Sequence, residues 1–374
     1  MCFERANPRL AVEGLHTIFS NNYCSVSELG SSMFSHALVL AGQIRRLALA
    51  FCTIVLVVPT FASLAHAAAP VIPVRYEEVV RSVLYLPMYV ALNQGYFKDA
   101  GLDVRMKTSQ GTDKGMAALL SGSADIVLIG PEASIYVANS ESPVKPKIFA
   151  GLTATDGFLL MARQPEPDFK WEDLKGKSVM AFRAGSNPDV FLEAALRKRG
   201  LDPKKDLKLV NNVGPAARTG SWLAGQNNYA IFLEPEAGTL EREGKAHTVA
   251  SIGKEVGQVD YTVFTATDKY IAANPEVIKA WIGVVSRAQK DVQTVAPEVL
   301  ATQVASFFPG LSQDDLTRAI TRYRDLSIWK TSTKVEAGAM AQLQEMLTHS
   351  GVLEAGKHVG YERLVFNEAG VVKP

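Results

Sequence analysis

Four short loops carry the side chains best suited to bind a small polar molecule. They read SQGTDKG (109–115), GPEAS (130–134), RAGSNPD (183–189) and LEPEAG (233–238), and each separates an apolar, strand-like run from a helical pattern. Helix starts present free N–H groups, and small, hydroxyl and amide residues leave them accessible to a ligand. We therefore predict hydrogen-bonded ligand recognition by these residues: Gly111, Thr112, Gly130, Arg183, Gly185, Ser186 and Asn187.

Two of these loops also place a carboxylate at the helix start, Glu132 and Glu234. A site for a sulfonate or another anion would favour bare N–H groups and arginine, whereas carboxylates accept hydrogen bonds and suit a ligand that donates them. We expect Glu132 and Glu234 to contact such a ligand. The alternative reading is that each carboxylate only complements the dipole of its own helix, and that the loops are ordinary helix caps.

A planar ligand would also need aromatic surfaces on which to stack. Tyr85 stands at a predicted helix start and Tyr261 in a predicted crossing between two lobes, so both are placed to face a cleft. Asp156, in the stretch TATDG (153–157), lies where the first crossing would meet that cleft. A simple turn would explain Asp156 equally well.

The sequence lacks the usual signatures of catalysis. Beyond residue 67 the histidines are His247, His349 and His358, and none is spaced with another His, Cys or carboxylate as a metal site requires. No Walker loop and no G-x-S-x-G motif is found. With 39 Lys and Arg against 38 Asp and Glu, the chain also has no basic surplus for nucleic acid. We predict a non-enzyme without metal, cofactor or nucleic-acid partner.

The first 67 residues have the pattern of a secretory leader. Residues 45–67, RRLALAFCTIVLVVPTFASLAHA, combine a basic pair, a short apolar run ended by Pro59, and the small-x-small cleavage signal AHA. The long stretch before the basic pair indicates that the start is too early, and Met33 would give a more ordinary leader. Cleavage after Ala67 would remove all three cysteines and leave a thiol-free periplasmic protein.

The functional loops need two α/β units to position them. Short apolar runs alternate with helical patterns from about residue 71, and a second series of the same kind follows the polar segment RQPEPDFKWEDLKGK (163–177). We predict a first lobe beginning with residues 68–162, a second lobe of residues 163–262, and a mainly helical completion of the first lobe by residues 263–374. Extended crossings near 160–166 and 259–267 would act as hinges for a ligand cleft.

Four motifs, in this order, resemble the periplasmic solute-binding proteins of ABC importers in the taurine, nitrate, sulfonate and thiamine-pyrimidine-precursor group. They are PMYVALNQGYFKDAGLDV, ALLSGSADIVLIGPEAS, WEDLKGKSVMAF and FLEPEAGTLEREGK, and the likeness spans about residues 72–350. The resemblance implies a type II periplasmic-binding-protein fold with a ligand cleft and two hinge crossings. It also implies a monomer that captures a small solute and delivers it to an inner-membrane ABC permease.

The resemblance does not select the solute. Members of this group bind sulfonates, nitrate or aminopyrimidines, and Glu132 with the aromatic candidates favours a nitrogen heterocycle such as a pyrimidine. The same fold group contains pyrimidine-synthesising enzymes of the thiamine pathway, which carry a Cys-rich motif and an active-site histidine. The predicted mature chain has no cysteine, which disfavours that enzymatic alternative. A sensor for a membrane signalling partner would use the same cleft.

Overall fold

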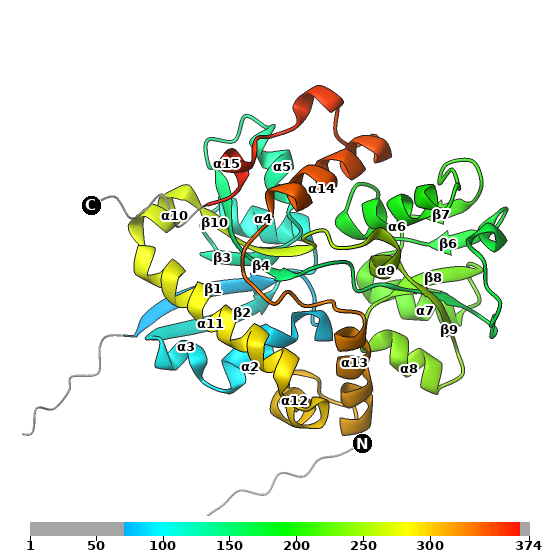
Figure 1. The fold of residues 1–374 in the computed structure, drawn as a ribbon, viewed down its shortest axis with the longest axis horizontal. Coiled ribbons are helices and arrows are strands. Elements are labelled where there is room, and N and C mark those ends of the chain that lie inside the picture. The colour runs from blue at the N-terminus through cyan, green and yellow to red at the C-terminus, as the bar shows by residue number, and fades with distance from the viewer. Residues whose placement is uncertain (1–70, 367–374) are drawn as a thin grey trace, which may run out of the picture. The chain divides into compact units, whose positions relative to one another are not determined.

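The computed structural model describes residues 71–366, which contain two five-stranded sheets (Figure 1). The first has the order β2-β1-β3-β10-β4 and the second the order β7-β6-β8-β5-β9. We call residues 71–153 and 262–366 lobe I, and residues 159–256 lobe II. The predicted leader and its cleavage site lie outside the described residues. The strands are β1 (Ile72–Glu78), β2 (Leu102–Thr108), β3 (Ile126–Ile129), β4 (Pro146–Thr153), β5 (Leu159–Ala162), β6 (Ser178–Met180), β7 (Lys208–Val210), β8 (Tyr229–Phe232), β9 (His247–Ser251) and β10 (Thr262–Thr267).

Both sheets follow the same plan. In lobe I, β1 pairs in parallel with β2 and β3, and β10 runs antiparallel between β3 and β4. In lobe II, β6 pairs in parallel with β7 and β8, and β5 runs antiparallel between β8 and β9. The antiparallel strand of each sheet is therefore the strand by which the chain enters or re-enters that lobe.

This plan corrects the predicted boundaries of the lobes. Residues 159–162, assigned from the sequence to the first lobe and its crossing, form β5 in the second sheet. All four side chains are buried, so this segment lacks the alternating pattern that marks a strand with one exposed face. Residues 262–267 form β10 of the first sheet. The two crossings are accordingly residues 154–158 and 257–261.

Helices flank both sheets and complete lobe I. In lobe I, the 3-10 turn η1 (Val83–Tyr85) precedes α2 (Leu86–Asn93) and α3 (Tyr96–Asp99), and lobe II contributes four helices. The remaining helices of lobe I are α4 (Thr112–Leu120), α5 (Glu132–Ala138), α10 (Asp268–Ala273), α11 (Pro275–Thr294), α12 (Pro297–Val304), α13 (Gln313–Asp325), α14 (Ala337–Ser350) and α15 (Tyr361–Leu364). The helices of lobe II are α6 (Asn187–Lys198), α7 (Arg218–Leu223), α8 (Glu236–Arg242) and α9 (Ile252–Val256).

Helix α11 shows why the helical C-terminal part belongs to lobe I. Its buried residues recur every three or four positions and give it one apolar face, which packs against α2, α3 and β4. Trp281 on this face is fully buried and contacts the rings of Tyr76, Phe97 and Phe264, with centroids 4.6–5.6 Å apart. The aromatic cluster fixes α11 on the first sheet.

Two helices of lobe I also reach lobe II. Helix α13 packs beside α8, and α14 packs beside α6, as Figure 1 shows. Ion pairs strengthen the first contact, because Arg242 of α8 pairs with Asp315 of α13. The lobes are thus connected through α13 and α14 as well as through the two crossings.

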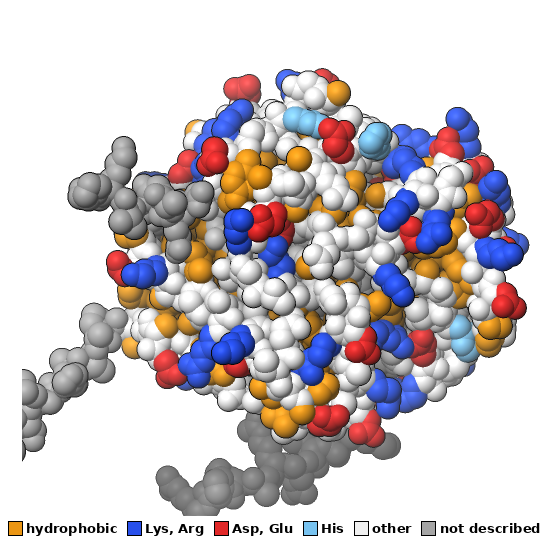
Figure 2. Space-filling model, in the orientation of Figure 1, with side chains coloured by type: hydrophobic (Ala, Val, Ile, Leu, Met, Phe, Trp, Pro, Cys, Tyr) orange, Lys and Arg blue, Asp and Glu red, His pale blue; other side chains and the backbone are white. Residues whose placement is uncertain are grey.

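Nothing in residues 71–366 has the length and apolarity of a membrane-crossing helix. On the face drawn in Figure 2, Lys and Arg side chains are interspersed with Asp and Glu. That mixture agrees with the balanced charge of the sequence.

Candidate functional site

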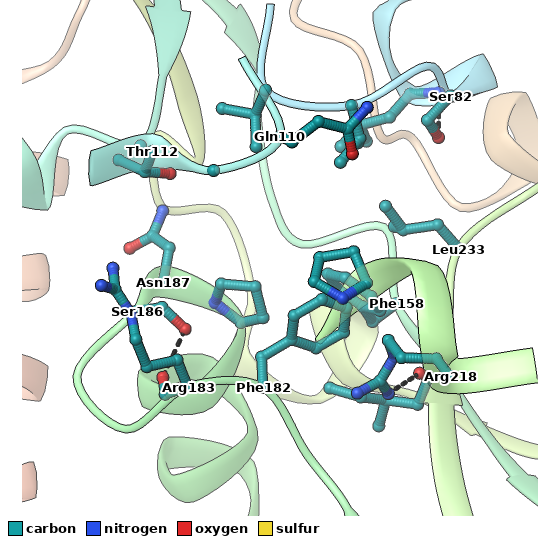
Figure 3. A pocket seen from close by; sticks show the side chains of 18 of the residues that line it. Ser82, Gln110, Thr112, Phe158, Phe182, Arg183, Ser186, Asn187, Arg218 and Leu233 are labelled. Carbon is teal, nitrogen blue, oxygen red and sulfur yellow. Dashed lines mark hydrogen bonds between the residues drawn. The ribbon is translucent and has the colours of Figure 1, made fainter. Parts of the chain in front are cut away.

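A cavity of about 750 Å³ lies between the two lobes. Its walls are the loops that follow β1, β2 and β3 in lobe I and β6, β7 and β8 in lobe II, together with parts of both crossings. Figure 3 shows Ser82, Gln110 and Thr112 along one side, and Phe182, Arg183 and Arg218 along the other. The cavity therefore has the position expected for a ligand at the carboxyl ends of parallel strands.

The structure brings most of the sequence-predicted candidates to this one cavity. Residues from both lobes and from the second crossing meet there, although they are up to 176 positions apart in the chain, as the numbers of Tyr85 and Tyr261 show. Their roles toward a ligand remain predictions. The candidates that line the cavity are Tyr85, Gly111, Thr112, Gly130, Arg183, Ser186, Asn187, Glu234 and Tyr261.

Glu132 is not on the cavity surface but directly behind it. Its carboxylate folds back over Gly130, so that a Cβ atom at position 130 would stand 2.7 Å from Cδ of Glu132. Oε2 of Glu132 is buried and finds no hydrogen-bond partner in the part of the chain that the structure describes. Burial raises the pKa of Glu132 to about 7, against the opposing effect of the backbone N–H groups of Glu132 and Asn187 and of the nearby Arg183.

Asp156 and Gly185 also lie off the cavity surface. Asp156 is fully buried in the first crossing, where it accepts a hydrogen bond from the N–H of Phe158 and leaves Oδ2 without a partner. Burial raises the pKa of Asp156 to about 8, so the carboxyl group is mostly protonated at neutral pH. Gly185 has a left-handed φ of +78°, and its carbonyl accepts a hydrogen bond of 2.8 Å from the hydroxyl of Tyr136.

Glu234 lines the cavity, but its carboxylate is already occupied. Oε1 pairs with Arg322 at 2.7 Å, and Oε2 accepts the N–H of Gly238 at 3.0 Å. The backbone of Glu234 is held as well, since its carbonyl accepts from Ser82 Oγ at 2.7 Å and its N–H donates to the hydroxyl of Tyr323 at 2.7 Å. Glu234 therefore fixes the loop after β8, and its carboxylate has little capacity left for a ligand.

Several contacts join the two walls of the cavity. Asn187, at the start of α6, donates to the carbonyl of Tyr261 at 2.8 Å and keeps Oδ1 buried without a partner. Arg183 of lobe II pairs with Asp113 of lobe I at 3.1 Å, and both side chains are more than half exposed. Such an exposed pair contributes at most about 1 kcal/mol.

The sequence analysis missed many of the cavity residues, and among these Phe158, Phe182 and Arg218 lie against one another. The rings of Phe158 and Phe182 lie 4.8 Å apart, and the guanidinium of Arg218 stacks on Phe182 at 3.9 Å. Arg218 is 2% exposed and donates to the carbonyls of Met180, Ala181 and Ile231. A cation at a helix start opposes the helix dipole, and this anomaly in PAARTG (215–220) could have drawn attention to Arg218.

No group of three His, Cys, Asp or Glu side chains in the described part of the chain could hold a metal ion. The polar groups that line the cavity are amides, hydroxyls and individual charged side chains, and they lie among apolar and aromatic side chains. That composition is typical of a site that binds a small organic molecule.

Comparisons with known proteins agree with this architecture. The family model described as NMT1/THI5 like matches residues 84–295. "Putative binding protein YtlA" of Bacillus subtilis (strain 168) is 35% identical over 296 residues, which cover 79% of this chain and 88% of that protein. "Taurine-binding periplasmic protein" of Escherichia coli (strain K12) is 25% identical over 186 residues, which cover 50% of this chain and 56% of that protein.

The fold itself is shared with a solved structure, the alkanesulfonate-binding protein SsuA from Xanthomonas axonopodis pv. citri bound to MOPS. The TM-score is 0.64 at 17% identity, over 78% of this chain and 97% of the other. This likeness confirms the predicted type II periplasmic-binding-protein fold. The family match over residues 84–295, with the 35% identity to the Bacillus protein, shows that this chain belongs to the NMT1/THI5-like family.

Proposed function

We propose that this protein is the substrate-binding component of an ABC importer and captures a small organic solute between its lobes. The observation that carries the proposal is the cavity of about 750 Å³, which is lined from both lobes and bounded by both crossings. Bending at residues 154–158 and 257–261 would open and close the cavity around a solute. The names of the relatives support binding rather than catalysis.

The partner in this proposal is an inner-membrane permease with its cytoplasmic ATPase. The protein would reach the periplasm through a cleaved leader, as the pattern in residues 45–67 favours, and would act there as a monomer. An enzyme of the thiamine-pyrimidine synthase type is a poorer fit, because no cysteine follows position 52.

For the solute we favour a planar nitrogen heterocycle, such as a pyrimidine related to thiamine precursors. Phe158 and Phe182 supply aromatic surface beside the cavity, and Tyr85 and Tyr261 line it. Asn187 Oδ1 is a buried acceptor that no donor within residues 71–366 uses, so an amino group of the solute would satisfy it. Neither carboxylate expected from the sequence serves as this acceptor, because that of Glu234 is already paired and Glu132 lies behind Gly130, off the cavity surface.

An organic anion such as a sulfonate or taurine is the second candidate. The observation in its favour is Arg218, a buried cation at the cavity whose hydrogen bonds go to backbone carbonyls. The names of the taurine-binding relative and of the alkanesulfonate-binding structure point the same way.

Thermal unfolding of the purified protein with two solute panels tests the proposal. One panel holds aminopyrimidines and related heterocycles, and the other holds alkanesulfonates, taurine and nitrate. A solute at a hundredfold its Kd adds about 2.7 kcal/mol, which corresponds to roughly 4 °C for a domain of about 300 residues. A shift with the heterocycles alone supports the favoured solute, and a shift with the anions alone replaces it with the second candidate. If neither panel nor a broader set of small metabolites shifts the midpoint, the binding role is refuted.

A further inference from the structure

Most charged side chains at the cavity are neutralised within the protein. Arg81 pairs with Glu78 at 2.9 Å, and Glu234 pairs with Arg322. Arg183 of lobe II and Asp113 of lobe I also neutralise each other, across the cavity. In the described part of the chain, three cavity-lining charges have no ion-pair partner: Lys114, Arg218 and Glu236. Lys114 is exposed to water, Arg218 is buried, and Glu236 is partly buried.

Arg218 is a positive charge held in place without a carboxylate. It is 2% exposed, its Nη atoms donate to three backbone carbonyls, and Phe182 covers one face of the guanidinium. Nε is buried and has no acceptor among the described residues. The carbonyls satisfy hydrogen bonds but not the net charge, so an anion in the cavity would gain strongly from this field.

Glu236 is the negative counterpart on the same side of the cavity. It begins α8, is partly buried, and makes no hydrogen bond or ion pair within the described residues. Burial raises the pKa of Glu236, and Arg218 opposes this shift. In the same way, burial lowers the pKa of Arg218 to about 10 while Glu236 favours its charged form. Both groups line the cavity from lobe II, and the described residues show no salt bridge between them.

Unpaired, partly dehydrated charges raise the free energy of the protein unless a bound solute pairs with them. We propose that Arg218 and Glu236 hold the two ends of one solute that carries both an anionic group and an amino group. The anionic group lies toward Arg218 and the amino group donates to Glu236. This inference rests on the proposed binding function and narrows the solute to one class. Both an amino-substituted heterocyclic acid and an aminoalkanesulfonate belong to that class.

Solutes that lack either the anionic group or the amino group test the two ends of the site separately. We would measure Kd by titration calorimetry for 4-aminopyrimidine-5-carboxylate, pyrimidine-5-carboxylate and 4-aminopyrimidine, and for taurine, ethanesulfonate and ethylamine. In at least one series the complete solute binds at least about tenfold more tightly than either truncated one, since each end makes a charge-assisted hydrogen bond. If the truncated solutes of both series bind as well as the complete ones, this inference is wrong while the binding function stands. If none of the six and no other small solute binds, the binding function itself fails.

The substitution Glu236→Gln tests whether Glu236 binds the amino group of the solute. Because Glu236 makes no hydrogen bond or ion pair within the described residues, the substitution should leave the fold intact. It should not weaken binding of the anionic solute without an amino group, since it only removes a negative charge. The tenfold preference for the complete solute should fall to about one. Glu243→Gln is the matched control, since Glu243 follows the same helix and lies outside the cavity. A preference that survives in Glu236→Gln would overturn the assignment. Arg218→Lys should weaken every anionic solute, and circular dichroism checks that this more disruptive variant is folded.

Discussion

Removing the Arg322 side-chain charge should destabilise the protein in a pH-dependent way. Arg322 lies on α13 and pairs with Glu234 at 2.7 Å and with Glu241 at 2.5 Å. The Glu234 side chain is 2% exposed, whereas that of Arg322 is 32% exposed. In Arg322→Met, the buried carboxylate of Glu234 keeps only the N–H of Gly238 as a donor. The variant therefore leaves a nearly uncompensated charge at the edge of the cavity.

The size of the effect follows from these exposures. Removing one partner of a fully buried pair costs about 3–5 kcal/mol. Because about a third of Arg322 is open to water, we expect a smaller loss of roughly 2–3 kcal/mol at pH 8. Urea unfolding followed by tryptophan fluorescence measures this loss. Arg318→Met is the matched control, because Arg318 is an exposed arginine on the same helix, and it should cost less than about 1 kcal/mol.

The pH dependence tests the physical cause. Burial raises the pKa of Glu234 above its ordinary value of 4.5, and Arg322 opposes that rise. Without Arg322 the pKa of Glu234 rises further, so the folded state holds the proton more tightly than the unfolded state. The destabilisation should therefore be small at pH 5, where Glu234 can protonate, and should grow toward pH 8. The double variant Arg322→Met/Glu234→Gln should recover most of the loss. Equal losses at both pH values, with no recovery in the double variant, would show that Arg322 acts through packing instead.

Three further predictions concern the crossing and the cavity walls. Asp156→Asn should flatten the pH dependence of the free energy of unfolding. The raised pKa of about 8 makes the folded wild type lose stability as the pH rises from about 4 to 8. An unchanged slope between pH 5 and 8 in urea unfolding would contradict this. Gly130→Ala should cost about 1–3 kcal/mol in thermal unfolding because its Cβ would collide with the Glu132 carboxylate, and the added substitution Glu132→Ala should restore part of the loss. Asp113→Asn should change the free energy of unfolding by less than about 1 kcal/mol because its pair with Arg183 is exposed, so a larger loss in the same assay would refute that reading.

Local sequence patterns determined most of the secondary structure. The predicted loops do separate strands from helices: β3 (Ile126–Ile129) is followed by α5 (Glu132–Ala138), and β6 (Ser178–Met180) is followed by α6 (Asn187–Lys198). Hydrophobic periodicity and Pro or Gly at element ends depend only on near neighbours, so they can be read without a structure. The loops after the strands also gave nine of the twelve site candidates a place at the cavity, because parallel strands bring their carboxyl ends together.

Only the tertiary structure decided to which sheet β5 belongs, whether the carboxylates of Glu132 and Glu234 are free to bind a ligand, and that Arg218 lies at the cavity. Leu159–Ala162 is apolar throughout, so nothing local indicates to which sheet it belongs. Glu234 looked available in the sequence, yet it is paired with an arginine 88 positions away, and Glu132 is turned behind Gly130. Arg218 stands at the cavity because three backbone carbonyls and Phe182 hold it there. Pairing, burial and side-chain direction arise from contacts between distant segments, and no local pattern encodes them.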